Sequence, residues 1–205
     1  MPLVTRLTGR RGKVKVFIDG EFWAELDAGV AADRGLSEGI ALSEEELAEA
    51  RIAGERPLAM SRALNILGYR ARSARELRER LARAGYLGVT VDEVISRLEE
   101  LGYLNDGEFA RELARSEARK YGPRRIYGDL RRAGIGEEAA REVVEEEFAG
   151  RSEYEAAREA AQRRYNTVER SDAQVRRVYG FLVRRGYSAS ICAEVAREYR
   201  READQ

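Results

Sequence analysis

The sequence of 205 residues contains no histidine, a single cysteine and only three lysines. Without histidine, it lacks the usual general base of serine and cysteine nucleophile systems and the commonest protein ligand of metal ions. Any catalysis would depend on carboxylates or on Lys13, Lys15 and Lys120. We therefore expect a protein that is not an enzyme and that holds no metal ion and no cofactor.

The single cysteine and the hydropathy of the chain indicate its surroundings. Cys192 cannot form an intramolecular disulfide or a multi-cysteine zinc site, and the nearby Ile191, Ala193 and Val195 are typical of a packed thiol. The first residues lack the apolar stretch of a signal peptide, and no run approaches the ~18 apolar residues of a membrane span. We expect a cytoplasmic protein that does not contact a membrane.

The formal charges balance, with 37 basic and 37 acidic residues. The total therefore argues neither for nor against a polyanionic partner, and only the distribution of charge is informative. Residues 150–205 are mildly basic, with 12 basic and 9 acidic residues. Arginine supplies 34 of the 37 basic residues, so the positions of the arginines determine where positive charge lies.

Residues 13–26 have the pattern of a β-hairpin. Two runs rich in β-branched and aromatic residues flank the pair Asp19-Gly20. Asp-Gly is typical of hairpin turns in which both central residues need positive φ. With residues 3–7 as a third strand, the N-terminus is predicted to form a small sheet. The segment from residue 8 is predicted to be a basic hairpin loop of this sheet, and its four basic residues could contact nucleic acid or form a solvated cluster: Arg10, Arg11, Lys13 and Lys15.

Helical patterns follow the sheet. Ser43 and Glu46 have the spacing of a capping box, which predicts a helix from there to about Ala53. From Pro57 onward strand patterns stop, and segments such as 73–84 have the spacing of amphipathic helices. We place the N-terminal β-hairpin region with its short helix at residues 1–56 and expect the remainder to be helical.

Three copies of one pattern organise the remainder. An aliphatic residue, a leucine and a glycine recur four residues apart, as Leu77-Leu81-Gly85, Ile126-Leu130-Gly134 and Val178-Leu182-Gly186. Suitable helix starts precede each copy, at Ser73, Pro123 and Ser171-Asp172, and each glycine suits the left-handed position that follows a helix. The pattern predicts a mainly α protein with three tandem three-helix repeats at 57–104, 105–149 and 150–205. Such units are expected to stack into an elongated, curved body.

The stretch Leu101-Gly-Tyr-Leu-Asn-Asp-Gly-Glu-Phe109 is predicted to join the first two repeats. Its acidic residues lack the alternate spacing and the closing glutamate of a calcium loop. We expect Gly102 to end one helix, Tyr103 and Leu104 to enter the core, and Asn105-Asp106 to begin the next helix.

Arginines occupy two equivalent positions in every middle helix. They are Arg75, Arg124 and Arg176 at the first position, and Arg83, Arg132 and Arg184 at the second. At about 100° per residue both positions lie off the apolar stripe, so we expect exposed side chains about 12 Å apart along each helix. A binding role and the general abundance of arginine explain the pattern equally well.

The residue between the two arginines differs among the repeats. The first repeat has Glu79 there, which predicts ion pairs with Arg75 and Arg83. The other repeats have Gly128 and Gly180, and a glycine in the middle of a helix costs up to ~1 kcal/mol against alanine. Two such glycines suggest that another helix or a ligand backbone comes close.

Several tyrosines lie near these arginines in the sequence, as base-stacking platforms would. Tyr86 and Tyr187 are at equivalent positions beside the repeat glycine, where the second repeat has Ile135. An isoleucine at this position favours packing in the core, and we expect the same of the two tyrosines.

Three segments resemble the most characteristic segments of the RecX family of bacterial regulatory proteins, in the same order. They are RALNILGYRARSARELRERLARAGY (62–86), VISRLEELGYLNDGEFA (94–110) and KYGPRRIYGDLRRAGI (120–135). The likeness is strong over about 58–150 and weaker over 151–201, and the N-terminal hairpin region is similar to that of longer members.

The resemblance implies a regulatory protein that binds the RecA–DNA filament, limits its growth and inhibits strand exchange and ATP hydrolysis. We expect a monomer whose partner is RecA, with DNA contacted within the filament and, because the overall charge is neutral, more weakly alone. Arg70, Arg72 and Arg75 match basic positions of the first family motif. Together with the repeat positions they give eight candidate contacts to RecA or DNA: Arg70, Arg72, Arg75, Arg83, Arg124, Arg132, Arg176 and Arg184. The alternative is a free-standing DNA- or RNA-binding protein whose middle helices act as recognition helices.

Overall fold

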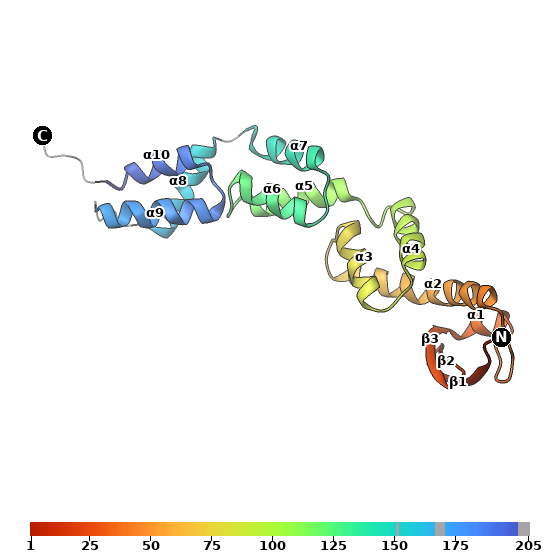
Figure 1. Cartoon of the computed structure of the whole chain (residues 1–205). Coiled ribbons are helices and arrows are strands. Elements are labelled where there is room, and N and C mark those ends of the chain that lie inside the picture. The colour runs from red at the N-terminus through yellow and green to blue at the C-terminus, as the bar shows by residue number, and fades with distance from the viewer. Residues whose placement is uncertain (151, 167–170, 201–205) are drawn as a thin grey trace, which may run out of the picture. The chain divides into compact units, whose positions relative to one another are not determined.

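The computed structural model describes residues 1–150, 152–166 and 171–200. The chain forms two compact units, Met1–Asn105 and Asp106–Gln205. The first unit contains a three-stranded sheet and four helices, α1 to α4, and the described part of the second contains α5 to α10 (Figure 1). None of the helices in the described ranges combines the length and apolar composition that a bilayer crossing requires.

The predicted N-terminal sheet is confirmed. Strands β1 (Val4–Arg10), β2 (Lys13–Ile18) and β3 (Glu21–Asp27) form an antiparallel sheet in the order β1-β2-β3. The β2–β3 turn has the predicted positive φ at Asp19 (50°) and Gly20 (91°). One face of the sheet packs on α1 (Ala28–Asp33) and α2 (Glu44–Tyr69), with Val14, Val16, Ala24 and Leu26 in the core. Within residues 1–105, all of which the structure describes, no helix packs on the opposite face.

Helix α2 begins as predicted but is much longer than expected. Ser43 and Glu46 form the capping box, in which the Glu46 N–H donates to Ser43 Oγ at 3.2 Å. The predicted end near Ala53 is wrong, because the helix continues through Pro57 to Tyr69. Pro57 is exposed, while the residues after it bury an apolar face that offsets the lost backbone hydrogen bond. The boundary predicted between residues 56 and 57 therefore lies inside one helix.

The second half of α2 forms the first three-helix repeat with α3 (Ala74–Arg83) and α4 (Gly88–Glu100). Ser73 caps α3 by accepting from the Glu76 N–H at 3.1 Å. A buried carboxylate ties the repeat together: Glu55 on α2 accepts from Arg51 Nε and from the Leu87 N–H, each at 2.8 Å. Sequence reasoning did not identify Glu55.

The other two repeats form the second unit. The second repeat consists of α5 (Asp106–Glu117), α6 (Pro123–Arg132) and α7 (Glu137–Phe148). The third consists of α8 (Glu153–Arg164), α9 (Asp172–Arg185) and α10 (Ala189–Arg197). The predicted core residues Leu77, Leu81, Ile126, Leu130, Val178 and Leu182 are all fully buried. Gly85, Gly134 and Gly186 have the predicted positive φ, which confirms the three-helix repeats.

The stretch after α4 agrees with its prediction except at Tyr103. Gly102 has φ 74°, and both following N–H groups donate to the Leu98 carbonyl. Leu104 enters the core, but Tyr103 is 61% exposed, so its predicted burial is wrong. The side chains of two successive residues at this turn point in different directions: that of Leu104 points into the core, and that of Tyr103 points to solvent.

Candidate functional site

The middle helix of the first repeat carries the predicted ion-pair network. Arg75 and Arg83 are exposed on α3, as their positions predicted. Arg75 Nε lies 3.1 Å from Glu79 Oε1, and Arg83 Nη2 lies 3.6 Å from Glu79 Oε2. Glu79 therefore neutralises part of the positive charge on this helix.

The two candidate arginines before α3 differ in accessibility. Arg70 is exposed and donates from Nη2 to Glu76 Oε1 at 3.1 Å. Only 12% of the Arg72 side chain is exposed, and Arg72 Nη1 lies 3.5 Å from Glu76 Oε2. Burial, together with the charges of Arg70 and Arg80, lowers the pKa of Arg72. Arg72 is thus positioned to stabilise the start of α3, and its part in partner binding stays a prediction.

In the second repeat, the two arginines of α6 are in different states. Arg132 pairs with Asp129 and donates from Nε to the Gly128 carbonyl at 3.3 Å. Arg124 is exposed in the first turn of the helix, and no carboxylate pairs with it within the part of the chain that the structure describes. The Arg124 guanidinium is therefore available to a partner without the breaking of an ion pair, whereas that of Arg132 is not.

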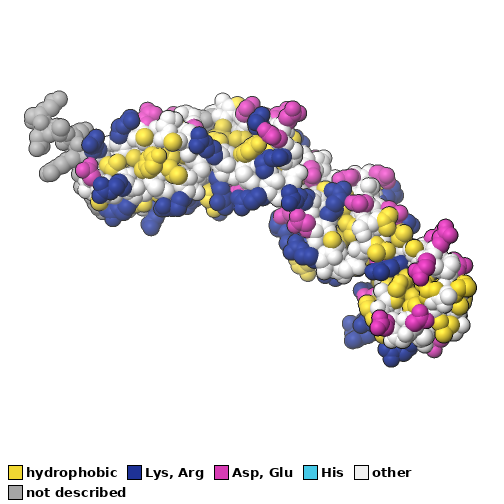
Figure 2. Space-filling view, in the orientation of Figure 1, with side chains coloured by type: hydrophobic (Ala, Val, Ile, Leu, Met, Phe, Trp, Pro, Cys, Tyr) yellow, Lys and Arg dark blue, Asp and Glu magenta, His cyan; other side chains and the backbone are white. Residues whose placement is uncertain are grey.

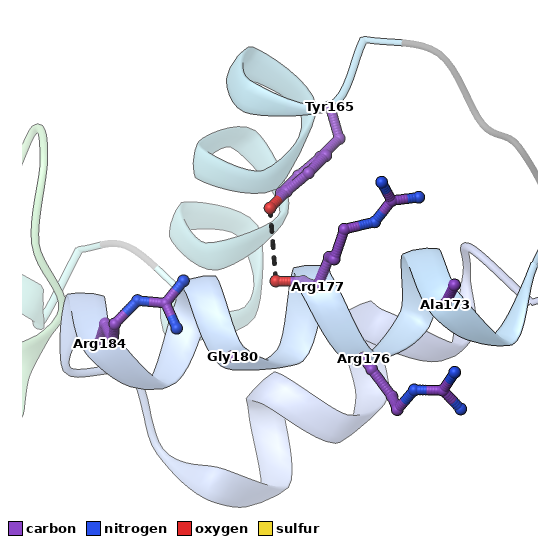
Figure 3. A pocket seen from close by; sticks show the side chains of 6 residues that line it. All are labelled: Tyr165, Ala173, Arg176, Arg177, Gly180 and Arg184. Carbon is purple, nitrogen blue, oxygen red and sulfur yellow. Dashed lines mark hydrogen bonds between the residues drawn. The ribbon is translucent and has the colours of Figure 1, made fainter.

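The middle helix of the third repeat leaves both of its arginines available. Arg176 and Arg184 are exposed on α9, and neither has an ion pair among residues 1–150, 152–166 and 171–200. Figure 3 shows the Arg184 guanidinium turned toward Gly180. The open hollow along this face, about 520 Å³, has no carboxylate in its lining, which consists of Tyr165, Ala173, Arg176, Arg177, Gly180 and Arg184. On the face shown in Figure 2, basic side chains gather over the third repeat.

Packing within the described chain does not account for the two helical glycines. A Cβ atom placed on Gly128 would have no heavy atom of a neighbouring element within 4 Å. A Cβ on Gly180 would meet only Arg184 Nη1, at 3.3 Å, and that guanidinium can move. Two explanations were offered for these glycines, the close approach of another helix or of a ligand. No other helix of the described residues comes close to either glycine, and the approach of a ligand stays a hypothesis.

The ends of α6 and α9 meet at two other glycines. The Gly122 N–H donates to the Arg185 carbonyl at 2.8 Å. A Cβ on Gly122 would lie 2.7 Å from Gly186 O, so the two backbones are in direct contact. Arg185 strengthens the joint by donating from Nη1 to the Lys120 carbonyl at 2.6 Å. The sequence did not indicate this contact, because it joins residues far apart in the chain.

The tyrosines next to the repeat glycines belong to the core, as predicted. Tyr187 is 3% exposed, and its hydroxyl donates to the Ala156 carbonyl at 3.3 Å. Ile135 is buried at the equivalent place, and Tyr86 is half-buried against the first core. Burial raises the pKa of the Tyr86 hydroxyl.

Comparison with known proteins covers all three repeats. The models for the first, second and third three-helix domains of RecX match residues 59–98, 105–144 and 152–195. The chain belongs to the RecX family of regulatory proteins. All eight candidate arginines lie within the matched RecX domains, whereas the N-terminal sheet precedes them.

Curated relatives carry the name regulatory protein RecX. The RecX of Amycolatopsis mediterranei is 34% identical over 67% of this chain and 81% of its own length. The RecX of Listeria monocytogenes serotype 4a is 28% identical over 94% of this chain and 72% of its own length. The latter alignment reaches well beyond the three helical domains.

Solved RecX structures have the same fold. A crystal structure of regulatory protein RecX matches with a TM-score of 0.58 and 22% identity, over 95% of this chain and 98% of that one. The crystal structure of RecX from Lactobacillus salivarius matches with a TM-score of 0.55 and 22% identity, over 71% of this chain and 96% of that one.

Proposed function

We propose that this RecX protein regulates the RecA recombinase by binding the RecA–DNA filament, limiting its extension and inhibiting strand exchange and ATP hydrolysis. Membership of a family of regulatory proteins supports a regulatory role. The exposed arginines of α6 and α9 that have no ion pair among the described residues, Arg124, Arg176 and Arg184, support a contact with an anionic partner.

The observation that carries the contact is the arrangement around Gly180. Arg176 and Arg184 lie four residues to either side of it, exposed and without ion pairs in the described chain. Arginine forks suit phosphates and carboxylates, the groups that DNA and an acidic protein surface present. The helix backbone at a glycine admits a closer approach than it would with a side chain. Arg124 and Gly128 repeat part of this arrangement on α6.

Binding alone can produce the proposed inhibition. A protein that contacts neighbouring subunits of a filament shifts the assembly equilibrium if it binds one state more tightly than another. The favoured state would be one that cannot extend or that hydrolyses ATP slowly. No reacting group from this chain is needed.

The test is RecA's ATP hydrolysis on single-stranded DNA, and strand exchange, with increasing amounts of this protein. We expect inhibition at substoichiometric amounts. The double charge reversal R176E/R184E should weaken it at least tenfold. The matched control R111E/R115E reverses two exposed arginines of α5, also in the second unit, and should leave inhibition intact.

The same titration separates the competing hypothesis of a free-standing nucleic-acid-binding protein. That hypothesis requires tight binding to naked DNA, with inhibition of RecA only when the DNA is saturated. Unchanged inhibition by R176E/R184E would remove α9 from the proposed interface.

A further inference from the structure

The outer face of the N-terminal sheet carries basic and aromatic side chains. Val14 and Val16 point into the core, so the alternate residues of β2 point outward. The strand register places Arg6 opposite Phe17, Thr8 opposite Lys15, and Arg10 opposite Lys13. Phe22 of β3 continues the same row beside Phe17.

Positive charge is concentrated on this face beyond what the fold requires. Residues 6–15 include five basic residues and no acidic one. Arg10 and Lys13 lie directly opposite each other, an arrangement that destabilises a sheet. Glu25 partly compensates, because its carboxylate lies 3.4 Å from Lys13 Nζ. These side chains surround a hollow of about 500 Å³, lined by Thr8, Arg10, Arg11, Lys13, Lys15 and Glu25.

The turn between β1 and β2 adds another arginine at an unfavourable position. Arg11 has φ 50°, followed by Gly12 at 76°. Asparagine, aspartate or glycine suits the first of these positions better than arginine does. The conformation of the turn therefore gives no reason for an arginine, whereas a guanidinium at the hairpin tip would extend the cationic surface.

The aromatic pair provides a surface for stacking. The Phe17 and Phe22 rings pack edge to face, with centroids 5.9 Å apart. Arg6 Cζ lies 4.1 Å from the Phe17 centroid, so a cation already covers that ring. Phe22 is 57% exposed and is one of the largest apolar groups on the surface of the first unit. An exposed phenylalanine next to cations is typical of proteins that bind unpaired bases.

We propose that the outer face of this sheet binds single-stranded nucleic acid, with Phe22 stacking on a base and Arg10, Arg11 and Lys15 contacting the phosphates. A duplex matches the charge but keeps its bases stacked on one another, so it offers no base face to Phe22. An acidic protein surface also matches the charge but leaves the aromatic pair without a role. The residues of this site are different from the arginines of the middle helices, so the inference does not depend on the proposed regulation of RecA.

Trp23, the single tryptophan, provides an intrinsic fluorescence signal from the strand that carries Phe22. It follows Phe22 in β3, is half-buried and packs against the core of the sheet. The full chain would be titrated with oligo(dT) at low salt and without RecA. An oligonucleotide of about 20 nucleotides is long enough to span the site of an ordinary single-strand-binding module. Trp23 emission and the anisotropy of a labelled oligonucleotide would be followed together. We expect saturable changes in both signals with one dissociation constant.

Two variants test the two kinds of contact. Phe22→Ala should weaken binding about tenfold, in the range measured for single base–aromatic stacks. Phe22→Tyr should restore binding, and Tyr103→Ala, which removes an exposed aromatic of the same unit, should not change it. R10E/R11E should also weaken binding at least tenfold and flatten its salt dependence, since each phosphate contact contributes about 0.7 to the slope. R111E/R115E again serves as the charge control.

Three results would overturn the proposal. Equal affinity for a duplex of the same length, with no effect of Phe22→Ala, would reduce the site to a general electrostatic contact. Binding of poly-glutamate but not oligo(dT), lost in R10E/R11E, would indicate a protein partner. Oligo(dT) binding that Phe22→Ala and R10E/R11E leave unchanged would place the nucleic acid elsewhere on the chain. Circular dichroism establishes that each variant is folded.

Discussion

The backbone N–H of Arg124 donates to the carbonyl oxygen of Gly186 at 3.1 Å. The first N–H groups of a helix have no partner within it, and in α6 the end of α9 supplies one. Pro123, at the first position of α6, has no N–H to satisfy. The beginning of the second middle helix is thus capped by the end of the third, which couples two repeats through their backbones.

Gly122→Ala should destabilise the second unit. The added methyl group would lie 2.7 Å from Gly186 O, and a backbone atom cannot move aside as a side chain can. We expect a loss of about 1–3 kcal/mol in the free energy of unfolding, the usual cost of overpacking. Urea denaturation followed by circular dichroism measures it. A variant as stable as the wild type would show that the joint accommodates a methyl group.

Gly128→Ala should have the opposite effect on stability. No atom of a neighbouring element lies within 4 Å of the added Cβ, so only the helix preference of alanine remains. We expect a gain of about 0.5–1 kcal/mol in the same denaturation experiment.

The same variant also tests the proposed interface. If a partner backbone packs against Gly128, the more stable Gly128→Ala protein should inhibit RecA several-fold less well. Gly88→Ala, at the start of α4 and equally free of neighbours, is the matched control and should inhibit normally. Full inhibition by Gly128→Ala would mean that nothing approaches this position closely.

Glu55→Ala should destabilise the first unit. The buried carboxylate accepts from Arg51 Nε and from the Leu87 N–H, and its removal leaves both donors without this partner. We expect a loss of about 2–4 kcal/mol, since breaking a buried charged pair from one side costs more than an exposed one. Trp23 emission during urea denaturation reports on this unit. Glu49→Ala, which removes an exposed carboxylate of the same helix, should cost less than about 1 kcal/mol.

Cys192 should be unreactive in the folded protein. Burial raises the pKa of its thiol from about 9 to about 11, with the nearby Glu153 carboxylate acting in the same direction. The thiolate is the reactive form, so a thiol reagent at pH 8 should modify the unfolded chain much faster than the folded one. Rapid modification under native conditions would contradict the buried position.

The same pKa predicts how stability depends on pH. The folded state favours the protonated thiol, so Cys192 contributes to the free energy of unfolding. This contribution is complete below pH 9, the ordinary pKa of the thiol, and is lost as the pH rises toward 11. The free energies of unfolding of the wild type and of Cys192→Ala, measured by denaturant titration, should therefore converge between pH 9 and pH 11. A difference that is constant from pH 8 to pH 11 would contradict it.

Local signals in the sequence were sufficient for much of the fold. The Ser43 and Ser73 caps, the Asp19-Gly20 turn and the repeat glycines all act within a few residues of their own positions, so their effects could be predicted without knowing the packing. The ion pairs of Glu79 with Arg75 and Arg83 are equally local, because residues four apart on a helix are neighbours.

Features that depend on distant residues could not be predicted in the same way. Pro57 normally favours a helix end, but burial of the residues after it keeps α2 continuous. Arg72 had the same local character as Arg70, and only the packing made it nearly inaccessible. The contact of Gly122 with Gly186, and the row of side chains from Arg6 to Phe22, likewise require the tertiary structure.

The continuity of α2 fixes the spacing between the sheet and the first repeat. Gly54 lies so close to Leu26 of β3 that an added Cβ would be 2.8 Å from Leu26 Cβ, while Ala59 and Ala63 lie in the core of the repeat. One residue inserted between Gly54 and Ala59 would turn one set of contacts by about 100° relative to the other. Insertions or deletions in this segment are therefore tolerable only when they are close to whole numbers of helical turns. Helix α2 thus sets both the distance and the rotation between the sheet and the first repeat.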